Sequence, residues 1–193
     1  MAEAPLKTKT VTIFGSSLPR EGSVIYADAL RLGRQLAHCG FVVCNGGYGG
    51  FMEATARGAR EAEGHTVGVT CSIWPSRPNP WIVEELRTES FSRRLMALIE
   101  QGDAYVALPG GTGTLAELAL AWEMMNKSSL SQSVGGRKPL LVMSPYWKSV
   151  IDCLEQEAHL AAAGPVAPPA ALEMVDLIDD IDAIADMLLA RLA

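Results

Sequence analysis

The alternation of short apolar runs with segments of helical periodicity constrains the fold of this chain more than any other sequence feature. The β-branched run "TVTIFGS" (10–16) is followed by apolar residues at helical spacing over 23–38. The same order repeats with "FVVCN" (41–45), a helical segment at 51–64 and the run "TVGVTCS" (66–72). Strands that alternate with helices form βαβ units, and continuous apolar strands are typical of a parallel sheet covered on both faces. The sequence therefore predicts an α/β fold with a mostly parallel sheet.

The rest of the chain continues this alternation. Helices are predicted at 91–102, 114–126, 147–158 and 180–192, and strands at 85–90, 104–110, 138–144 and 172–179. Irregular loops are predicted at 73–83, 128–136 and 159–171. The chain has no internal repeat and the length of one domain. We therefore expect a single domain over 1–193, with its core at about 10–192, built as a Rossmann-like, doubly wound sheet flanked by helices.

Composition limits the partners and the compartment. The chain has 193 residues, of which 49% are apolar and 20% charged, and a net charge of −6. A nucleic-acid binder normally presents a basic face, so we expect no nucleic-acid partner. The four cysteines include no C-x-x-C pair, which argues against a metal site and a disulfide framework. With no apolar run near the ~18 residues of a membrane span and no signal-peptide core at the start, we expect a cytoplasmic protein without a membrane partner.

Three loops rich in glycine or serine follow predicted strands: "FGSS" (14–17), "NGGYGG" (45–50) and "LPGGTG" (108–113). In a parallel sheet, such loops share the edge formed by the carboxyl ends of the strands, where α/β proteins bind their ligands. Each loop taken alone has a simpler explanation, since glycine permits tight strand-to-helix turns. Two of the loops lead directly into helices, whose free N–H groups bind phosphate without a basic surface. Together the loops indicate a site for a small anionic ligand.

Several familiar motifs are missing from these loops. No Gly-Lys pair follows "GGTGT", so the P-loop pattern is not met. The first strand runs into "FGSSLPREG" rather than G-x-G-x-x-G, which argues against hydride transfer with a dinucleotide. No lysine stands in a motif for pyridoxal phosphate, so lysine decarboxylation is rejected. The three histidines have no serine or cysteine partner in a recognisable motif, which argues against nucleophilic catalysis.

The signature "PGGTGTLAE" (109–117) resembles that of the LONELY GUY (LOG) family of cytokinin-activating phosphoribohydrolases. The segments "FGSS" and "GGYGGFMEATARGA", and an arginine nine residues before "DAYVALPGG", add to a likeness that covers most of residues 10–145. The resemblance implies hydrolysis of the N-glycosidic bond of a nucleoside 5′-monophosphate, either AMP or a cytokinin-type N6-modified AMP. The products would be the free base and ribose 5-phosphate. The family also implies a homodimer.

The resemblance assigns roles to individual residues. The family's catalytic arginine corresponds to Arg94 and its catalytic glutamate to Glu117. The residues expected to bind the phosphate or the nucleotide are Gly15, Ser16, Gly46, Gly47, Gly50, Gly110, Gly111, Thr112, Gly113 and Thr114. Departure of the base leaves positive charge on the sugar, and a carboxylate can stabilise that charge or orient the attacking water. An arginine offers a forked cation to phosphate or ribose oxygens. Helix N–H groups take the phosphate, so we expect no metal and no cofactor.

The chain departs from the best-known family members in two places. Their second loop reads G-G-G-x-x-G-L-M-G, whereas this chain has Asn45 for the first glycine and Glu53 for the last. They carry Arg-Lys at the catalytic arginine, whereas Arg94 is preceded by Arg93 and followed by Leu95. The second loop resembles a divergent branch that is also similar to molybdenum-cofactor carrier proteins. The alternative function is therefore a carrier or a nucleotide sensor that binds its ligand without cleaving it.

Simpler structural roles stand beside these assignments. Thr114 and Glu117 have the T-x-x-E spacing of a capping box, which does not exclude a role in the site. Arg93 and Arg94 point about 100° apart on a helix, so only one can face a cleft, and the alignment favours Arg94. Glu53 lies in the first turn of its helix, where it either contacts the ligand or is simply an anion stabilised by the helix dipole.

Two apolar groups also remain open to more than one interpretation. Trp74 and Trp81, in the 73–83 loop, either stack on a base or have an ordinary role in packing or in a subunit contact. An apolar stripe at helical spacing is predicted to lie in the core or at a dimer interface. Its members are Leu115, Leu118, Ala119, Trp122 and Met125.

Overall fold

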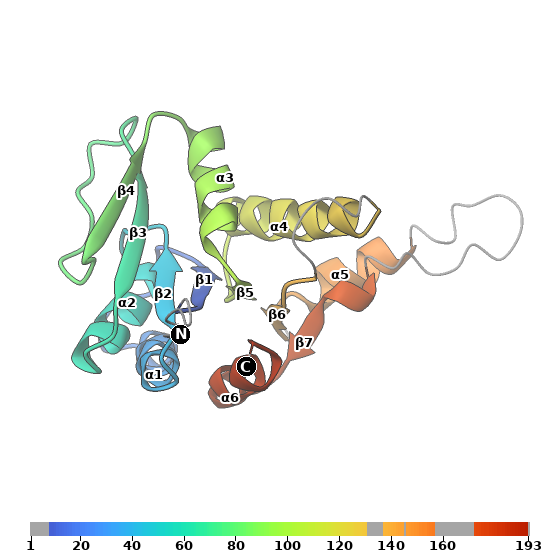
Figure 1. Ribbon diagram of the computed structural model, residues 1–193, viewed down its shortest axis with the longest axis horizontal. Coiled ribbons are helices and arrows are strands. Elements are labelled where there is room, and N and C mark those ends of the chain that lie inside the picture. The colour runs from blue at the N-terminus through green and yellow to red at the C-terminus, as the bar shows by residue number, and fades with distance from the viewer. Residues whose placement is uncertain (1–7, 131–136, 145, 157–171, 193) are drawn as a thin grey trace, which may run out of the picture.

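The computed structural model describes residues 8–130, 137–144, 146–156 and 172–192 (Figure 1). The strands are β1 (Thr10–Phe14), β2 (Val42–Asn45), β3 (Thr66–Cys71), β4 (Glu84–Thr88), β5 (Ala104–Ala107), β6 (Leu140–Met143) and β7 (Asp176–Ile178). The helices are α1 (Val24–His38), α2 (Phe51–Glu61), α3 (Phe91–Gln101), α4 (Thr112–Leu130), α5 (Lys148–Glu155) and α6 (Ile184–Leu192). All seven strands form one parallel sheet in the order β4-β3-β2-β1-β5-β6-β7. The predicted α/β, doubly wound class is confirmed.

The chain winds outward from β1 in both directions. The first half adds β2, β3 and β4 on one side of β1, and α3 then carries the chain back to β5 on the other side. Strands β1 and β5 pair in parallel, with Val11 opposite Ala104. Neighbouring strands whose connections leave in opposite directions form a crevice at their carboxyl ends, which is the usual ligand site of such sheets. The fold therefore places the predicted loops beside this crevice.

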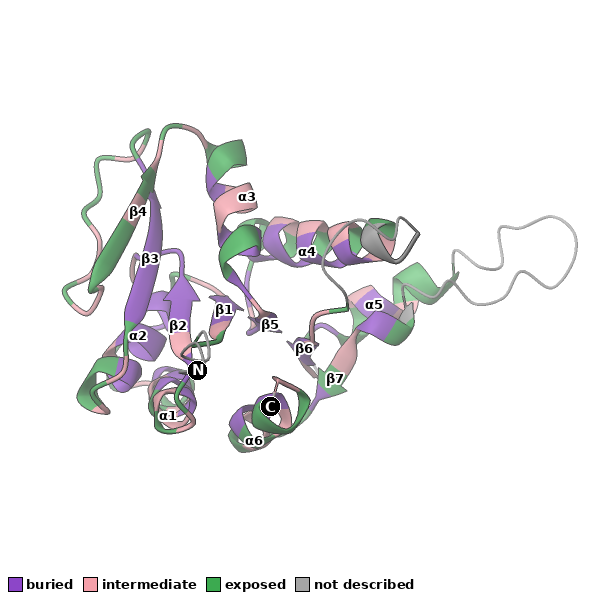
Figure 2. Ribbon diagram, in the orientation of Figure 1, coloured by how far each residue is buried: buried purple, intermediate pink, exposed green. Residues whose placement is uncertain are grey.

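Two apolar cores lie on the two faces of the sheet. Helices α1, α2 and α6 cover one face, where Val11 and Ile13 of β1 pack with Leu32 of α1. Helices α3, α4 and α5 cover the other, where Phe14 packs with Leu98. Figure 2 shows the central strands buried between these layers. Burial of such side chains contributes roughly 1.5–3 kcal/mol each to folding, which is the main force that holds the layers together.

Local signals explain three of the helix boundaries, namely both ends of α1 and the start of α3. The Ser23 side chain accepts a hydrogen bond from the Tyr26 N–H and caps α1, and Ser90 does the same for α3 with the Arg93 N–H. Gly40, with a φ of 82°, follows the end of α1. These caps lie where the sequence predicts the two helices to begin and end.

Several predicted boundaries differ in the structure, among them the end of α4 and the start of β7. Helix α4 continues to Leu130, so the loop predicted at 128–136 begins inside a helix, because the serines there are tolerated in one. The strand predicted at 172–179 is a 3-10 turn (Leu172–Met174) followed by the short β7. Residues 131–136 and the predicted loop at 159–171 lie outside the described residues. Among the helices of the described residues, none has the length and apolar character needed to cross a membrane.

The apolar stripe of α4 divides between core and surface. Leu118, Trp122 and Met125 are buried in the core with α3 and α5. Leu115 is 37% exposed and Ala119 is also exposed. The predicted core role therefore holds for three of the five positions, and the homodimer stays a prediction.

Candidate active site

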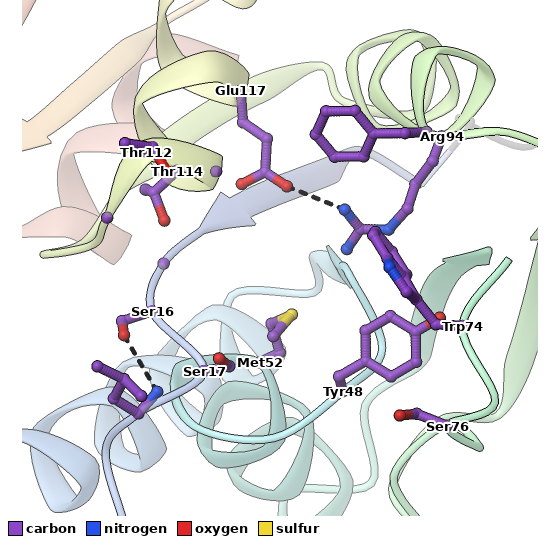
Figure 3. A pocket seen from close by; sticks show the side chains of 15 residues that line it. Ser16, Ser17, Tyr48, Met52, Trp74, Ser76, Arg94, Thr112, Thr114 and Glu117 are labelled. Carbon is purple, nitrogen blue, oxygen red and sulfur yellow. Dashed lines mark hydrogen bonds and ion pairs between the residues drawn. The ribbon is translucent and has the colours of Figure 1, made fainter.

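Three loops meet at the carboxyl ends of β1, β2 and β5, as the sequence predicts (Figure 3). The Ser16 N–H donates to the Pro109 carbonyl oxygen at 3.0 Å, and the Phe51 N–H donates to the Ser16 carbonyl oxygen at 2.9 Å. A Cβ on Gly15 would lie 3.0 Å from the Phe51 ring and 3.3 Å from Leu108. The loop after β1 is therefore hydrogen-bonded to the loops after β2 and β5. It packs closely against both because Gly15 has no side chain.

A cleft of about 570 Å³ opens beside these loops. This volume lies within the range of small-molecule binding sites. The lining residues are Gly15, Ser16, Ser17, Leu18, Tyr48, Met52, Trp74, Ser76, Phe91, Arg94, Gly111, Thr112, Gly113, Thr114 and Glu117. The cleft therefore draws on both halves of the chain, at the switch point between β1 and β5.

Helix α4 contributes its N-terminus to the cleft. The helix begins at Thr112, and its first helical bond runs from the Leu115 N–H to the Gly111 carbonyl oxygen at 2.9 Å. The N–H groups of a first turn have no acceptor within the helix and carry partial positive charge. A Cβ on Gly111 or Gly113 would meet nothing within 4 Å. The backbone of this turn is therefore open to an anionic ligand.

The capping-box interpretation of Thr114 and Glu117 is wrong. Helix α4 begins at Thr112, so Thr114 lies inside its first turn rather than at the N-cap. The Thr114 side chain folds over Gly110, where an added Cβ would lie 2.1 Å from Thr114 Oγ1. The cap position belongs to Gly111, which has no side chain to signal it. Glu117 lies beyond the first turn, and its side chain lines the cleft instead of bonding to a cap.

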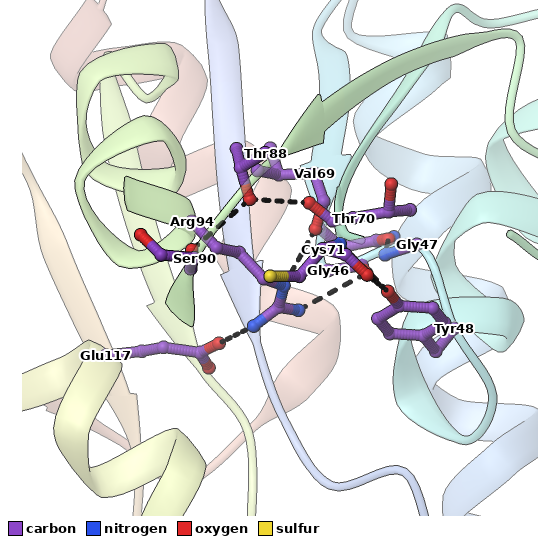
Figure 4. Close-up of polar contacts among 11 residues, drawn as sticks. Gly46, Gly47, Tyr48, Val69, Thr70, Cys71, Thr88, Ser90, Arg94 and Glu117 are labelled. Carbon is purple, nitrogen blue, oxygen red and sulfur yellow. Dashed lines mark hydrogen bonds and ion pairs between the residues drawn. The ribbon is translucent and has the colours of Figure 1, made fainter. Parts of the chain in front are cut away.

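Arg94 is 5% exposed and is held by three hydrogen bonds (Figure 4). Its Nε donates to the Val69 carbonyl oxygen at 2.8 Å, and its Nη2 donates to the Gly46 carbonyl oxygen at 3.2 Å. Its Nη1 donates to Glu117 Oε1 at 3.3 Å. Arg93, by contrast, lies on the exposed side of α3. Of the two arginines, Arg94 is therefore the one that faces the cleft.

Glu117 is a buried carboxyl group, with 9% of its surface exposed. Burial disfavours the ionised form and raises the pKa of Glu117 to about 7, although the Arg94 guanidinium acts in the opposite direction. A carboxyl group that titrates near neutral pH inside a cleft can exchange a proton with a ligand or with water. The Arg94–Glu117 pair therefore gives this cleft a group that can exchange protons near neutral pH.

Three aromatic side chains lie beside Arg94 or beside one another, namely Trp74, Tyr48 and Phe91, of which the sequence drew attention only to Trp74. The Arg94 Cζ lies 5.3 Å from the centre of the Trp74 ring and 5.7 Å from the centre of the Tyr48 ring. Trp74 also makes an edge contact with Phe91, at 6.0 Å between ring centres. Trp81 stacks on Arg57 and does not line the cleft. The spacing of Phe91 three residues before Arg94, one helical turn, is the signal that could have found one of these rings.

The two departures from the family loop lie outside the cleft lining. Asn45 is fully buried: its Nδ2 donates to the Met52 carbonyl oxygen at 2.9 Å and its Oδ1 accepts the Gly47 N–H at 2.8 Å. This side chain therefore ties the second loop to α2, a structural role that accounts for its presence. Glu53 is half-buried in the first turn of α2 and is not among the cleft residues.

The residues predicted to bind a ligand divide into two groups. Those that line the cleft together with Arg94 and Glu117 are Gly15, Ser16, Gly111, Thr112, Gly113 and Thr114. Those that do not line it are Gly46, Gly47, Gly50 and Gly110. Gly46 has a clear indirect role, because a Cβ there would lie 1.9 Å from Arg94 Nη2. The second loop therefore makes room for Arg94 and bonds to it.

Comparison with known proteins identifies the family of this chain. The sequence matches the SLOG cluster4 family over residues 8–143. A probable cytokinin riboside 5′-monophosphate phosphoribohydrolase of Oryza sativa subsp. japonica is 30% identical over 174 residues, which cover 84% of this chain and 64% of the rice protein. The cytokinin riboside 5′-monophosphate phosphoribohydrolase of Rhodococcoides fascians is 27% identical over 190 residues, 95% of this chain and 91% of that protein. The chain thus spans less than two thirds of the rice relative.

Solved structures share the fold. The molybdenum cofactor binding protein of the phototrophic bacterium Rippkaea orientalis has a TM-score of 0.72 with this chain at 20% identity. The match covers 97% of this chain and 99% of that protein. At this level of identity, the likeness establishes a common architecture.

Proposed function

The chain belongs to the SLOG cluster4 family, and on that premise we propose that it hydrolyses the N-glycosidic bond of a nucleoside 5′-monophosphate. The proposed substrate is AMP or a cytokinin-type N6-modified AMP, and the products are the free base and ribose 5-phosphate. The observation that carries the proposal is the position of Glu117. This buried carboxyl group shares one cleft with Arg94 and with the open N-terminus of α4. Relatives named as phosphoribohydrolases support the same reaction.

The first turn of α4 is the proposed phosphate site. Its N–H groups and partial positive charge favour an anion, and Gly111 and Gly113 leave room for close approach. Glu117 lies one turn further along the same helix, which suits a ribose attached to that phosphate. In the ionised form, its carboxylate would stabilise the positive charge that develops on the sugar and would orient the attacking water.

Arg94 completes the proposed mechanism. A guanidinium has five N–H donors, and Val69, Gly46 and Glu117 take three of those of Arg94 within the described residues. The other two are free to bind ribose or phosphate oxygens. Because its position is fixed in advance, the cation binds a substrate without first losing the freedom of a mobile side chain.

The test is a panel of nucleoside monophosphates assayed for free base and ribose 5-phosphate. We expect release from at least one purine nucleotide and a loss of about 10²–10⁴ in kcat for Glu117→Gln. Glu123→Gln is the matched control, because Glu123 lies on the same helix but is exposed and paired with Lys127. Release from none of the nucleotides, or a wild-type rate for Glu117→Gln, would contradict the proposal.

Ligand binding without cleavage is the second candidate function. The observation that favours it is the bonding of Arg94 to the carbonyl oxygens of Val69 and Gly46, which joins α3 to β3 and the second loop and gives Arg94 a structural role. In this reading, the Arg94–Glu117 pair supports the cleft of a carrier, such as one for a molybdenum cofactor. The same panel separates the two functions, since a carrier binds a ligand and releases no base.

A further inference from the structure

The rings of Tyr48 and Trp74 lie nearly perpendicular to each other beside the Arg94 guanidinium. Their ring planes meet at 79°, with 5.7 Å between the ring centres, and the Arg94 Cζ lies over both rings. The face of an aromatic ring attracts a cation, and the attraction grows when water is excluded. Arg94 is almost completely buried. We call Tyr48 and Trp74 the ring pair.

Tyr48 is held at both its ends. Its hydroxyl oxygen accepts the Cys71 N–H at 3.0 Å, at the end of β3. Its main-chain carbonyl oxygen accepts a hydrogen bond from Asn79 Nδ2 at 2.8 Å. The Asn79 N–H also donates to the Gly47 carbonyl oxygen at 2.8 Å. The loop after β3 therefore fixes the backbone of Tyr48 while β3 itself fixes the ring.

We propose that Tyr48 and Trp74 are positioning residues that hold the Arg94 guanidinium against the Glu117 carboxyl group. This inference rests on the proposed function above. The 3.3 Å contact between Arg94 Nη1 and Glu117 Oε1 is longer than the ~2.7–2.9 Å of a strong charge-assisted hydrogen bond. A contact of that length depends on neighbours that keep the guanidinium from moving away. The ring pair lies where it can supply that restraint.

Arg94 is the cation that stabilises the charged form of Glu117. Besides Glu117, the ionisable side chains that line the cleft within the described residues are Arg94 from α3 and Tyr48 from the loop after β2. The loops after β1 and β5 contribute only Gly, Ser, Leu and Thr. Movement of Arg94 away from Glu117 would therefore raise the pKa of that carboxyl group further, while entry of water would lower it. The direction of the change thus distinguishes lost positioning from an opened cleft.

The test compares Tyr48→Leu and Trp74→Leu with a conservative variant and a matched control. Tyr48→Phe keeps the ring and removes only the hydroxyl tether. Trp81→Leu makes the same change in the same loop, but at a ring that stacks on Arg57 and does not line the cleft. We expect kcat to fall about tenfold in the two test variants with KM nearly unchanged. Tyr48→Phe should retain most of the rate, and Trp81→Leu should match the wild type.

A second readout does not depend on turnover. Titration of Glu117, followed by carbon-13 NMR of its carboxyl carbon, should show a higher midpoint in Tyr48→Leu and Trp74→Leu than in the wild type. An unchanged or lower midpoint would overturn the proposal, as would a rise in KM alone, which would assign the rings to stacking on a base. If the wild type releases no base, the proposed function fails, but the titration still decides whether the ring pair positions Arg94.

Discussion

Replacement of Gly46 by alanine tests whether the position of Arg94 controls the rate of the proposed reaction. An added Cβ would lie 1.9 Å from Arg94 Nη2 and 2.7 Å from Met52 Sδ. The Gly46 backbone is not in the left-handed region, so alanine creates no backbone strain there. The added methyl group would therefore clash with the Arg94 guanidinium and the Met52 side chain, and the guanidinium must move.

The geometry sets the size of the effect. To regain an ordinary contact, Arg94 Nη2 must retreat by about 1.5 Å, which breaks its hydrogen bonds to Gly46 and Glu117 at 3.2 and 3.3 Å. A misplacement of about 1 Å in a catalytic group can cost roughly 100-fold in rate. Overpacking costs about 1–3 kcal/mol of stability, which lowers the melting temperature by several degrees and leaves the protein folded. The expected result is a loss of activity much larger than the loss of stability.

The assay is the release of free base under saturating nucleotide, together with thermal unfolding of each variant. Gly64→Ala is the matched control, because its Cβ would lie 2.5 Å from the Ala37 Cβ, between α1 and the end of α2. It should lower the melting temperature by a similar amount and keep the wild-type kcat. A Gly46→Ala variant with kcat within about twofold of wild type would refute the reasoning. So would an equal loss of kcat in Gly64→Ala.

Three further predictions concern the same region. Burial raises the pKa of Glu117 to about 7 in the folded state, whereas the carboxyl group in the unfolded chain has its ordinary pKa of 4.5. Stability should therefore fall as pH rises between these two values. Glu117→Gln should remove that slope, as measured by urea unfolding at pH 5 and pH 8. Gly113→Ala should raise KM at least about tenfold by filling the phosphate site, yet stabilise α4 by about 0.5–1 kcal/mol; an unchanged KM would place the phosphate elsewhere. Asn45→Gly, which restores the family residue, should lower the free energy of unfolding by about 2–4 kcal/mol, as measured by equilibrium unfolding. The reason is the loss of buried hydrogen bonds to Met52, Thr55 and Gly47. A loss below about 1 kcal/mol would contradict the structural role of Asn45.

The order of strands and helices could be predicted because each segment carries its own periodicity. The start of α4 could not, because its cap is Gly111, a residue with no side chain to signal it, while Thr114 and Glu117 have capping-box spacing by coincidence. A local pattern predicts the start of a helix most directly when a side chain makes the N-cap. At the start of α4, the cap is made by the backbone of Gly111 alone.

The candidate site was predicted in part. The sequence signature pointed to Arg94 and Glu117, and the structure brings them together in one cleft. The ring pair could not be predicted, because Tyr48 and Trp74 lie in different loops and meet only through the pairing of β2 with β3. The role of Gly46 was missed for a similar reason, since its small size matters only once Arg94 packs on it.

The winding of the sheet has a consequence for the order of events during synthesis. During synthesis, Arg94 emerges from the ribosome 23 residues before Glu117. The start of β1 bonds to a residue beside β5 that lies 93 positions later in the chain. Until α4 emerges, a nascent chain that closed around Arg94 would bury a charge with no counter-charge, which is strongly unfavourable. The first half of the chain is therefore expected to remain open on the ribosome, and contacts of such long range make the final closure slow.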